Sequence, residues 1–226
     1  MSTNRLLPAG IAVAALLAVL AGIDVLPASL LFVFKPLATL LIIAFAWPRG
    51  ARQGRQRRFI AIGLVLSLLG DVALLWPRQG FLPGLVAFLL AHLAYIAAFC
   101  VPVRLAARPW VFVAYAVVAA AILSQLWAGV PGALRAPVVA YVLCLATMAA
   151  QAAVWWRAST DRPDAALAGR AALGGVLFMA SDSLLAINKF VLPLPLASLW
   201  ILASYWAAQV CIAGSLHALE EPRKAA

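Results

Sequence analysis

Charged residues inside long apolar stretches are the first candidates for chemistry in this 226-residue sequence, and three stand out: Lys35, Asp71 and Asp182. A charge at the centre of a bilayer costs about 2.5–3.5 kcal/mol even on lenient insertion scales, so each such group needs a partner or a function. Two buried carboxyl groups that share one site do not both ionise readily. We therefore predict that Asp71 and Asp182 form an acid–base pair, in which either one is the proton donor.

The stretches that position these residues are long enough to cross a membrane. The chain is 66% hydrophobic and 11% charged, whereas a soluble domain is about 45–50% apolar and about 25% charged. A membrane-spanning helix needs about 20 apolar residues. Eight stretches have about this length: 7–23, 28–47, 59–76, 82–103, 110–128, 136–156, 165–187 and 196–216. They predict an all-α polytopic membrane protein, with a single domain of eight transmembrane helices over residues 1–226. No remaining loop is long enough for a separate catalytic or nucleotide-binding domain.

The basic residues predict the orientation of this bundle. If both termini lie on one face, that face carries thirteen basic residues, namely Arg5, Arg49, Arg52, Arg55, Arg57, Arg58, Arg104, Arg108, Arg157, Arg162, Arg170, Arg223 and Lys224. The opposite face carries only Arg78, Arg135 and Lys189. The positive-inside rule then places both termini in the cytoplasm, and we expect a bacterial cytoplasmic (inner) membrane.

The net charge of +10 does not indicate a nucleic acid partner. Arginines are concentrated in residues 49–58, directly between two expected spans and without interleaved aromatic residues that could stack on bases. This pattern is typical of a topology determinant that contacts anionic lipid headgroups. We expect membrane lipids as partners and no nucleic acid.

Depth in the membrane relates the polar residues to one another. At about 1.5 Å per residue, Lys35, Asp71 and Asp182 all fall roughly 8–11 Å beneath the outer surface. Other polar residues near this depth or the midplane are Tyr141, His92, Tyr205 and Gln209. We therefore predict a polar cavity in the outer half of the bundle.

Alternative interpretations remain open for each of these residues. The two aspartates could reach interfacial water while Lys35 extends toward the membrane surface. For His92, a structural role is as plausible as a catalytic one. Tyr205 and Gln209 could instead form hydrogen bonds between helices.

Several short motifs carry a resemblance to a known family. They include Gly70-Asp71, Phe88 with His92 and Tyr95, Ala208-Gln209 after Tyr205, and above all the tract 178–190, which reads Ser-Asp-x-x-Leu-Ala-x-Asn-Lys-Phe from Ser181. With Lys35-Pro36-Leu37, these residues make the sequence similar to the YhhN-like membrane family, whose animal members are lysoplasmalogenases.

The resemblance implies a fold, a reaction and a set of site residues. The fold is an eight-span helical bundle, and the reaction is hydrolysis of the vinyl ether bond of a lysoplasmalogen, or of a related single-chain lysolipid, inside the bilayer. The products are a fatty aldehyde and a glycerophospho headgroup. The catalytic candidates are Asp71 and Asp182, and the substrate-binding candidates are Lys35, His92, Tyr141, Asn188, Lys189, Tyr205 and Gln209.

The chemistry of a vinyl ether agrees with the paired carboxyl groups. Such an ether hydrolyses when an acid protonates its outer carbon, because the resulting oxocarbenium ion is then captured by water. One aspartate would deliver this proton, while the other stabilises the cation and orients the water. Lys35 would neutralise the ionised aspartate or bind the lipid phosphate.

No metal or other cofactor is expected. The two histidines, His92 and His217, lie far apart in the sequence, and Cys100, Cys144 and Cys211 fall in three different stretches. Neither set has the spacing of a zinc site.

Two other functions fit the sequence less well. A proton-coupled small-molecule transporter would use the same charged residues as a relay, but Pro36 and Gly174-Gly175 do not interrupt matching stretches of two halves. A di-aspartyl intramembrane protease is the weaker alternative, because Leu69-Gly70-Asp71 follows Leu68 where a Gly-x-Gly-Asp motif needs its first glycine.

Overall fold

The computed structural model describes residues 3–51, 53–76 and 78–218, and all the regular elements in these ranges are helices. They are α1 (Thr3–Gly22), η1 (Ala28–Leu30), α2 (Leu31–Ala46), α3 (Gly54–Ala73), α4 (Phe81–Phe99), α5 (Pro109–Leu126), α6 (Gly132–Ala158), α7 (Ala165–Phe190) and α8 (Ala197–Ala213). The predicted all-α class is confirmed, and each of the eight apolar stretches contains one α-helix.

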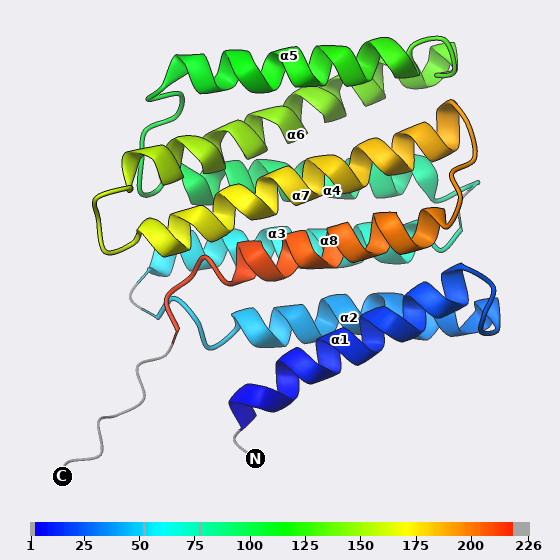
Figure 1. The fold of residues 1–226 in the computed structure, drawn as a ribbon, viewed down its shortest axis with the longest axis horizontal. Coiled ribbons are helices and arrows are strands. Elements are labelled where there is room, and N and C mark those ends of the chain that lie inside the picture. Colours follow the sequence, from blue (N-terminus) through cyan, green and yellow to red (C-terminus); the bar gives the residue numbers. More distant parts are fainter. Residues whose placement is uncertain (1–2, 52, 77, 219–226) are drawn as a thin grey trace.

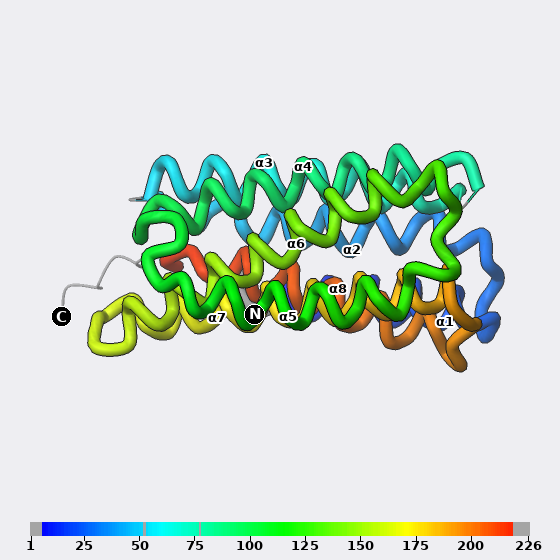
Figure 2. The backbone as a smooth tube through the Cα atoms, turned by 90° about the horizontal axis from the view of Figure 1, so that it is seen from above, coloured from blue at the N-terminus to red at the C-terminus, as the bar shows by residue number. Residues whose placement is uncertain are grey.

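The helices run side by side in two layers. Helices α2, α3 and α4 form one layer, while α1, α8, α7 and α5 form the other, and α6 crosses obliquely between them (Figures 1 and 2). Successive helices are antiparallel, so the connections alternate between the two ends of the bundle (Figure 1). Helix α5 packs mainly on α6 and makes little contact with α7.

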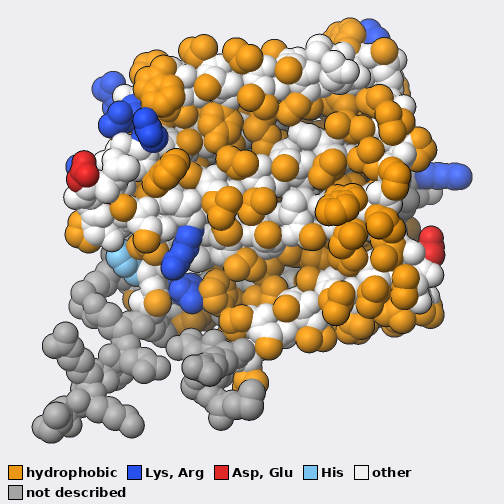
Figure 3. Space-filling view, viewed as in Figure 1, with side chains coloured by type: hydrophobic (Ala, Val, Ile, Leu, Met, Phe, Trp, Pro, Cys, Tyr) orange, Lys and Arg blue, Asp and Glu red, His pale blue; other side chains and the backbone are white. Residues whose placement is uncertain are grey.

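Five of the helical segments are long and apolar enough to cross a membrane: η1 with α2, α4, α5, α6 and α7. Helices α1 and α8 provide shorter apolar segments, Leu6–Gly22 and Ala197–Ala213. Large hydrophobic side chains cover the outside of the bundle, including Val13, Val117 and Leu143, each more than half exposed (Figure 3). A soluble protein rarely exposes an apolar surface of this extent, and the protein is an integral membrane protein.

Small residues allow the helices to approach closely. Alanine makes up much of the buried interior, as is common where transmembrane helices pack. At Gly70 of α3, an added Cβ would lie 2.5 Å from the ring of Phe88 on α4. Only glycine therefore permits this separation of α3 and α4, which places Asp71 beside Phe88.

Several helix ends differ from the predicted boundaries. Helix α3 begins at Gly54, so Arg55, Arg57 and Arg58 lie in its first turns, and it ends at Ala73, only two residues after Asp71. Helix α7 continues to Phe190 and so includes Asn188 and Lys189. The predicted boundaries mark where the apolar residues end in the sequence. The helices themselves continue, because backbone hydrogen bonds extend through polar residues that also favour helices.

Apart from the buried Lys35, the basic residues of the described ranges lie near the two ends of the bundle. Among the described residues, the order and bounds of the helices place Arg78, Arg135 and Lys189 at the end that holds η1 and the other arginines near the opposite end. The predictions for Arg52, Arg223 and Lys224, and for the side chain of Arg5, lie outside the described residues.

Candidate active site

Asp71 is held by two hydrogen bonds and an ion pair. It is 1% exposed and lies in the last turn of α3. Its Oδ2 accepts hydrogen bonds from Thr39 Oγ1 at 2.6 Å and from the Tyr205 hydroxyl at 2.7 Å. Its Oδ1 lies 3.7 Å from Nζ of Lys35, which is itself buried on α2. All three partners stabilise the ionised carboxylate.

A chain of hydrogen bonds supports the donors of Asp71. On one side, Trp206 Nε1 donates to Thr39 Oγ1 at 3.2 Å. On the other side, Tyr95 donates to Gln209 Oε1 at 2.7 Å, and Gln209 Nε2 donates to the Tyr205 hydroxyl at 3.2 Å. Gln209 is fully buried and lines neither of the two cavities beside the aspartates. Its hydrogen bond therefore orients the Tyr205 hydroxyl from behind.

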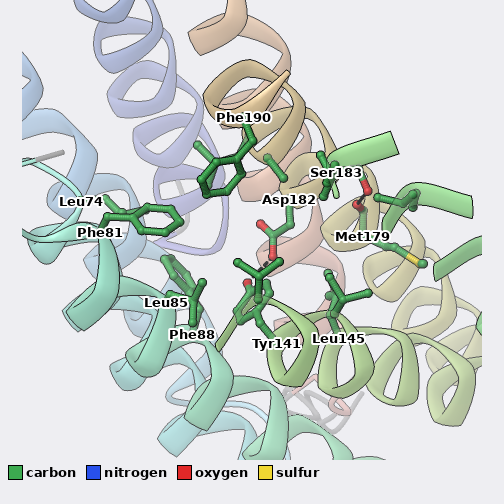
Figure 4. A pocket seen from close by; sticks show the side chains of 16 residues that line it. Leu74, Phe81, Leu85, Phe88, Tyr141, Leu145, Met179, Asp182, Ser183 and Phe190 are labelled. Atoms are coloured by element: carbon green, nitrogen blue, oxygen red, sulfur yellow. Dashed lines mark hydrogen bonds between the residues drawn. The ribbon is translucent and has the colours of Figure 1, made fainter. Parts of the chain in front are cut away.

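Asp182 has a different environment on α7. The Tyr141 hydroxyl of α6 donates a hydrogen bond to Asp182 Oδ2, and the two side chains point toward one another among apolar neighbours (Figure 4). Within the described ranges, no lysine or arginine forms an ion pair with it. A carboxyl group with one phenol donor and apolar surroundings is better suited than Asp71 to hold a proton.

The two aspartates line one polar cavity of about 300 Å³ at the η1 end of the bundle. Other predicted site residues in its wall are Lys35, Asn188, Lys189 and Tyr205. Asn188 also holds the α7–α8 connection, because its Oδ1 accepts a hydrogen bond from the Leu194 amide at 2.8 Å. The exposed Lys189 places its Nζ 4.2 Å from the centre of the Phe81 ring.

A second, apolar cavity adjoins the first. This slot of about 70 Å³ lies among α4, α5, α6 and α7, and Tyr141, Asp182 and Ser183 are the polar residues in its wall (Figure 4). Asp182 and Phe88 line both cavities. The Asp182 carboxyl group therefore lies at the junction between a polar and an apolar compartment.

His92 is placed differently from the other predicted residues. It is fully buried, and neither ring nitrogen has a hydrogen-bond partner in the described part of the chain. Its ring packs against Phe178, with centroids 4.6 Å apart, and against Tyr141, at 5.3 Å. It lines neither cavity, so its contact with the site is through the Tyr141 ring.

Sequence reasoning missed three members of this arrangement as site residues: Thr39, Tyr95 and Trp206. Thr39 offered a signal, because it follows Lys35 by four residues and so lies on the same face of a helix. In the sequence, Tyr95 belongs only to a family motif. Trp206 is one of eight tryptophans in this hydrophobic sequence, and only the fold brings it to Thr39.

Comparisons with known proteins find lysoplasmalogenases among the sequences similar to this chain. The chain is 34% identical to the lysoplasmalogenase TMEM86B of Homo sapiens over 188 residues, which cover 83% of this chain and 75% of that protein. It is 34% identical over 187 residues to a lysoplasmalogenase of Mycobacterium tuberculosis, with 76% and 66% coverage. It is 33% identical over 165 residues to the human lysoplasmalogenase TMEM86A, with 72% and 67% coverage.

No solved structure matches the chain. The sequence profile of the YhhN family matches residues 30–216, a range that contains both aspartates and every other residue of the two cavities. The chain belongs to the YhhN family.

Proposed function

We propose that this protein hydrolyses the vinyl ether bond of a lysoplasmalogen, or of a closely related single-chain lysolipid, to a fatty aldehyde and a glycerophospho headgroup. The names of its relatives support this reaction. The single observation that carries the proposal is the position of Asp182 between a polar and an apolar cavity. A lysolipid has the same division, and its vinyl ether lies where the polar headgroup joins the hydrocarbon chain.

The two cavities suggest how the substrate binds. The headgroup enters the polar cavity, where Lys189 is the exposed cation available to the phosphate. Lys35 is less available, because it is buried and paired with Asp71. The beginning of the hydrocarbon chain enters the apolar slot beside Tyr141. The vinyl ether then lies against Asp182.

The hydrogen bonds favour one division of roles between the aspartates. Asp182 is the acid: it transfers its proton to the outer vinyl carbon, and the ether becomes an oxocarbenium ion. Asp71, ionised by Lys35, Thr39 and Tyr205, stabilises this cation and accepts a proton from the attacking water. The product of this step is a hemiacetal.

Collapse of the hemiacetal returns both aspartates to their starting states. Asp182, now ionised, accepts the proton of the hemiacetal hydroxyl, and the bond from that carbon to the glycerol oxygen breaks. Asp71 gives its proton to the departing glycerol oxygen. The aldehyde and the glycerophospho headgroup leave, with Asp182 protonated and Asp71 ionised as before.

An assay on the purified protein in detergent tests this proposal. A lysoplasmalogen should release aldehyde, whereas its saturated ether analogue should not, because the analogue has no double bond to protonate. Asp71→Asn and Asp182→Asn should each abolish release without lowering the yield of folded protein. Asp24→Asn is a matched control, because Asp24 is exposed in the α1–η1 connection at φ 61°, a conformation that asparagine accepts.

Two results would contradict the proposal. Aldehyde release that survives both aspartate substitutions would remove their catalytic role. If the wild-type protein released aldehyde from no single-chain lipid, the proton-coupled transporter would become the better explanation of the buried charges.

We further propose that all eight α-helices span a bacterial inner membrane, with both termini in the cytoplasm. The unequal distribution of basic residues between the two ends supports this orientation. Single cysteines at the exposed positions Ala51 and Gln79, in a variant without the native cysteines, test it in intact cells. A membrane-impermeant maleimide should label Gln79→Cys from outside, while Ala51→Cys should react only after the cells are opened. The reverse pattern would overturn the orientation.

A further inference from the structure

A third cavity, of about 380 Å³, lies between α5 and α7 on the outside of the bundle. Its wall includes Ala114 and Val118 from α5 and Val176 and Ala180 from α7. These four side chains are exposed, and α5 and α7 make little direct contact. This α5–α7 groove therefore faces the hydrocarbon region of the surrounding membrane.

The groove is continuous with the apolar slot of the candidate active site. Ile122, Met179 and Ser183 line both. Ser183 offers no free donor along this route, because its hydroxyl donates to the Met179 carbonyl of its own helix at 2.6 Å. The wall that joins the two spaces is accordingly suited to a hydrocarbon chain.

The slot alone is too small for a long lipid chain. A cavity needs roughly 10–15 Å³ of free volume for each water-sized group, so the 70 Å³ slot accommodates only a handful of methylene groups. The groove offers several times this volume. A chain whose first carbons lie beside Asp182 must continue elsewhere, and the groove is an apolar space that adjoins the slot through shared wall residues.

We propose that the α5–α7 groove binds the distal part of the substrate's hydrocarbon chain and is the lateral route by which that chain enters from the bilayer. This inference rests on the proposed function, since it takes the ligand to be a single-chain lipid with its vinyl ether at Asp182. Ala114 and Val176 lie farther toward the cytoplasmic end of their helices than Ile122 and Ser183. The groove consequently receives the end of a long hydrocarbon chain, whereas a short chain ends before it reaches the groove.

Chain-length dependence provides the test. Ala114→Trp fills the groove at its distal end, and Ala116→Trp is the matched control, because Ala116 is exposed on α5 and does not line the groove. With long-chain and short-chain lysoplasmalogens in detergent, Ala114→Trp should lower kcat/KM for the long chain by about tenfold or more, which is within the range that one steric mismatch produces. It should leave the short-chain substrate within about twofold of wild type. Ala180→Phe, which obstructs the same groove from α7, should do the same.

A binding measurement separates this inference from the proposed function. Saturated ether analogues of both chain lengths are titrated against a fluorescent single-chain lipid bound to wild-type, Ala114→Trp and Ala116→Trp proteins. A selective loss of long-chain binding in Ala114→Trp supports the groove, even if the wild-type protein hydrolyses no lysoplasmalogen and the proposed function fails. Equal effects on both chain lengths, or none in Ala114→Trp and Ala180→Phe, would overturn the inference while leaving hydrolysis intact.

Discussion

The Tyr205 hydroxyl on α8 donates a hydrogen bond of 2.7 Å to Oδ2 of Asp71 on α3. These residues are 134 positions apart in the chain, and their contact joins α8 to α3 in the wall of the polar cavity. The same tyrosine accepts a hydrogen bond from Gln209. Tyr205 thereby links the carboxylate to the buried polar side chains behind it.

Tyr205→Phe should lower turnover of a lysoplasmalogen by about ten- to a hundredfold while the protein remains folded. The substitution removes one of two hydroxyl donors from Asp71, and a hydrogen bond to a charged group contributes about 1.5–3 kcal/mol. Aldehyde release by the purified protein measures the effect. Ser204→Ala is the control on the same helix, since the Ser204 hydroxyl donates to the backbone carbonyls of Trp200 and Ile201 within α8. Unchanged turnover in Tyr205→Phe would exclude Tyr205 from stabilising Asp71.

Lys35→Met should destabilise the protein by about 3–5 kcal/mol, because it leaves the carboxylate of Asp71 buried without its cation. The double variant Lys35→Met with Asp71→Asn should recover most of the lost stability, yet it should release no aldehyde. Thermal unfolding in detergent, followed for both single variants and the double variant, measures the coupling. If the two single effects simply added, the pair would not interact in the folded protein.

His92→Leu should leave thermal stability unchanged or slightly higher. The imidazole is fully buried and neither nitrogen has a partner in the described chain, and an unsatisfied buried polar group costs about 1–3 kcal/mol. Because His92 lines neither cavity, turnover should fall less than about threefold. A loss of a hundredfold or more in a stably folded His92→Leu protein would instead indicate that the imidazole takes part in the reaction.

Gly70→Ala should lower both stability and turnover. The new Cβ would lie 2.5 Å from the ring of Phe88, and overpacking of this kind costs about 1–3 kcal/mol. Phe88 lines both cavities, so its displacement changes the junction at Asp182. Gly54→Ala is the control, since a Cβ at that position meets no atom within 4 Å. Equal unfolding temperatures and equal turnover in the two variants would contradict this account.

The sequence predicted which helices carry the polar residues better than it predicted how those residues pair. The apolar stretches located every α-helix, and the depth argument grouped Lys35, Asp71 and Asp182, which do line one cavity. Helix ends were less accurate, as at Asn188 and Lys189, because polar residues extend a helix beyond its apolar run.

The hydrogen-bond partners of the polar side chains could not be predicted, because they depend on how each helix is rotated and packed. Asp71 accepts hydrogen bonds from Thr39 and Tyr205, and Asp182 accepts one from Tyr141. Equal depth in the membrane would also have allowed other partners. Gln209 falls one turn below Tyr205, and only the fold reveals that the Tyr95 hydroxyl of α4 is its donor. A single threonine or tyrosine within an apolar stretch gives little warning of such a contact.

In both chains of hydrogen bonds that end at Asp71, every hydrogen atom is directed toward the carboxylate. Hydrogen atoms are directed toward the carboxylate from Trp206 through Thr39, and from Tyr95 through Gln209 and Tyr205. A proton that arrived on Oδ2 would face two hydrogens already directed at that atom, so a hydroxyl would have to turn away to accommodate it. In the proposed mechanism, this arrangement opposes a lasting proton on Oδ2 and so favours the return of Asp71 to its ionised form before the next substrate binds.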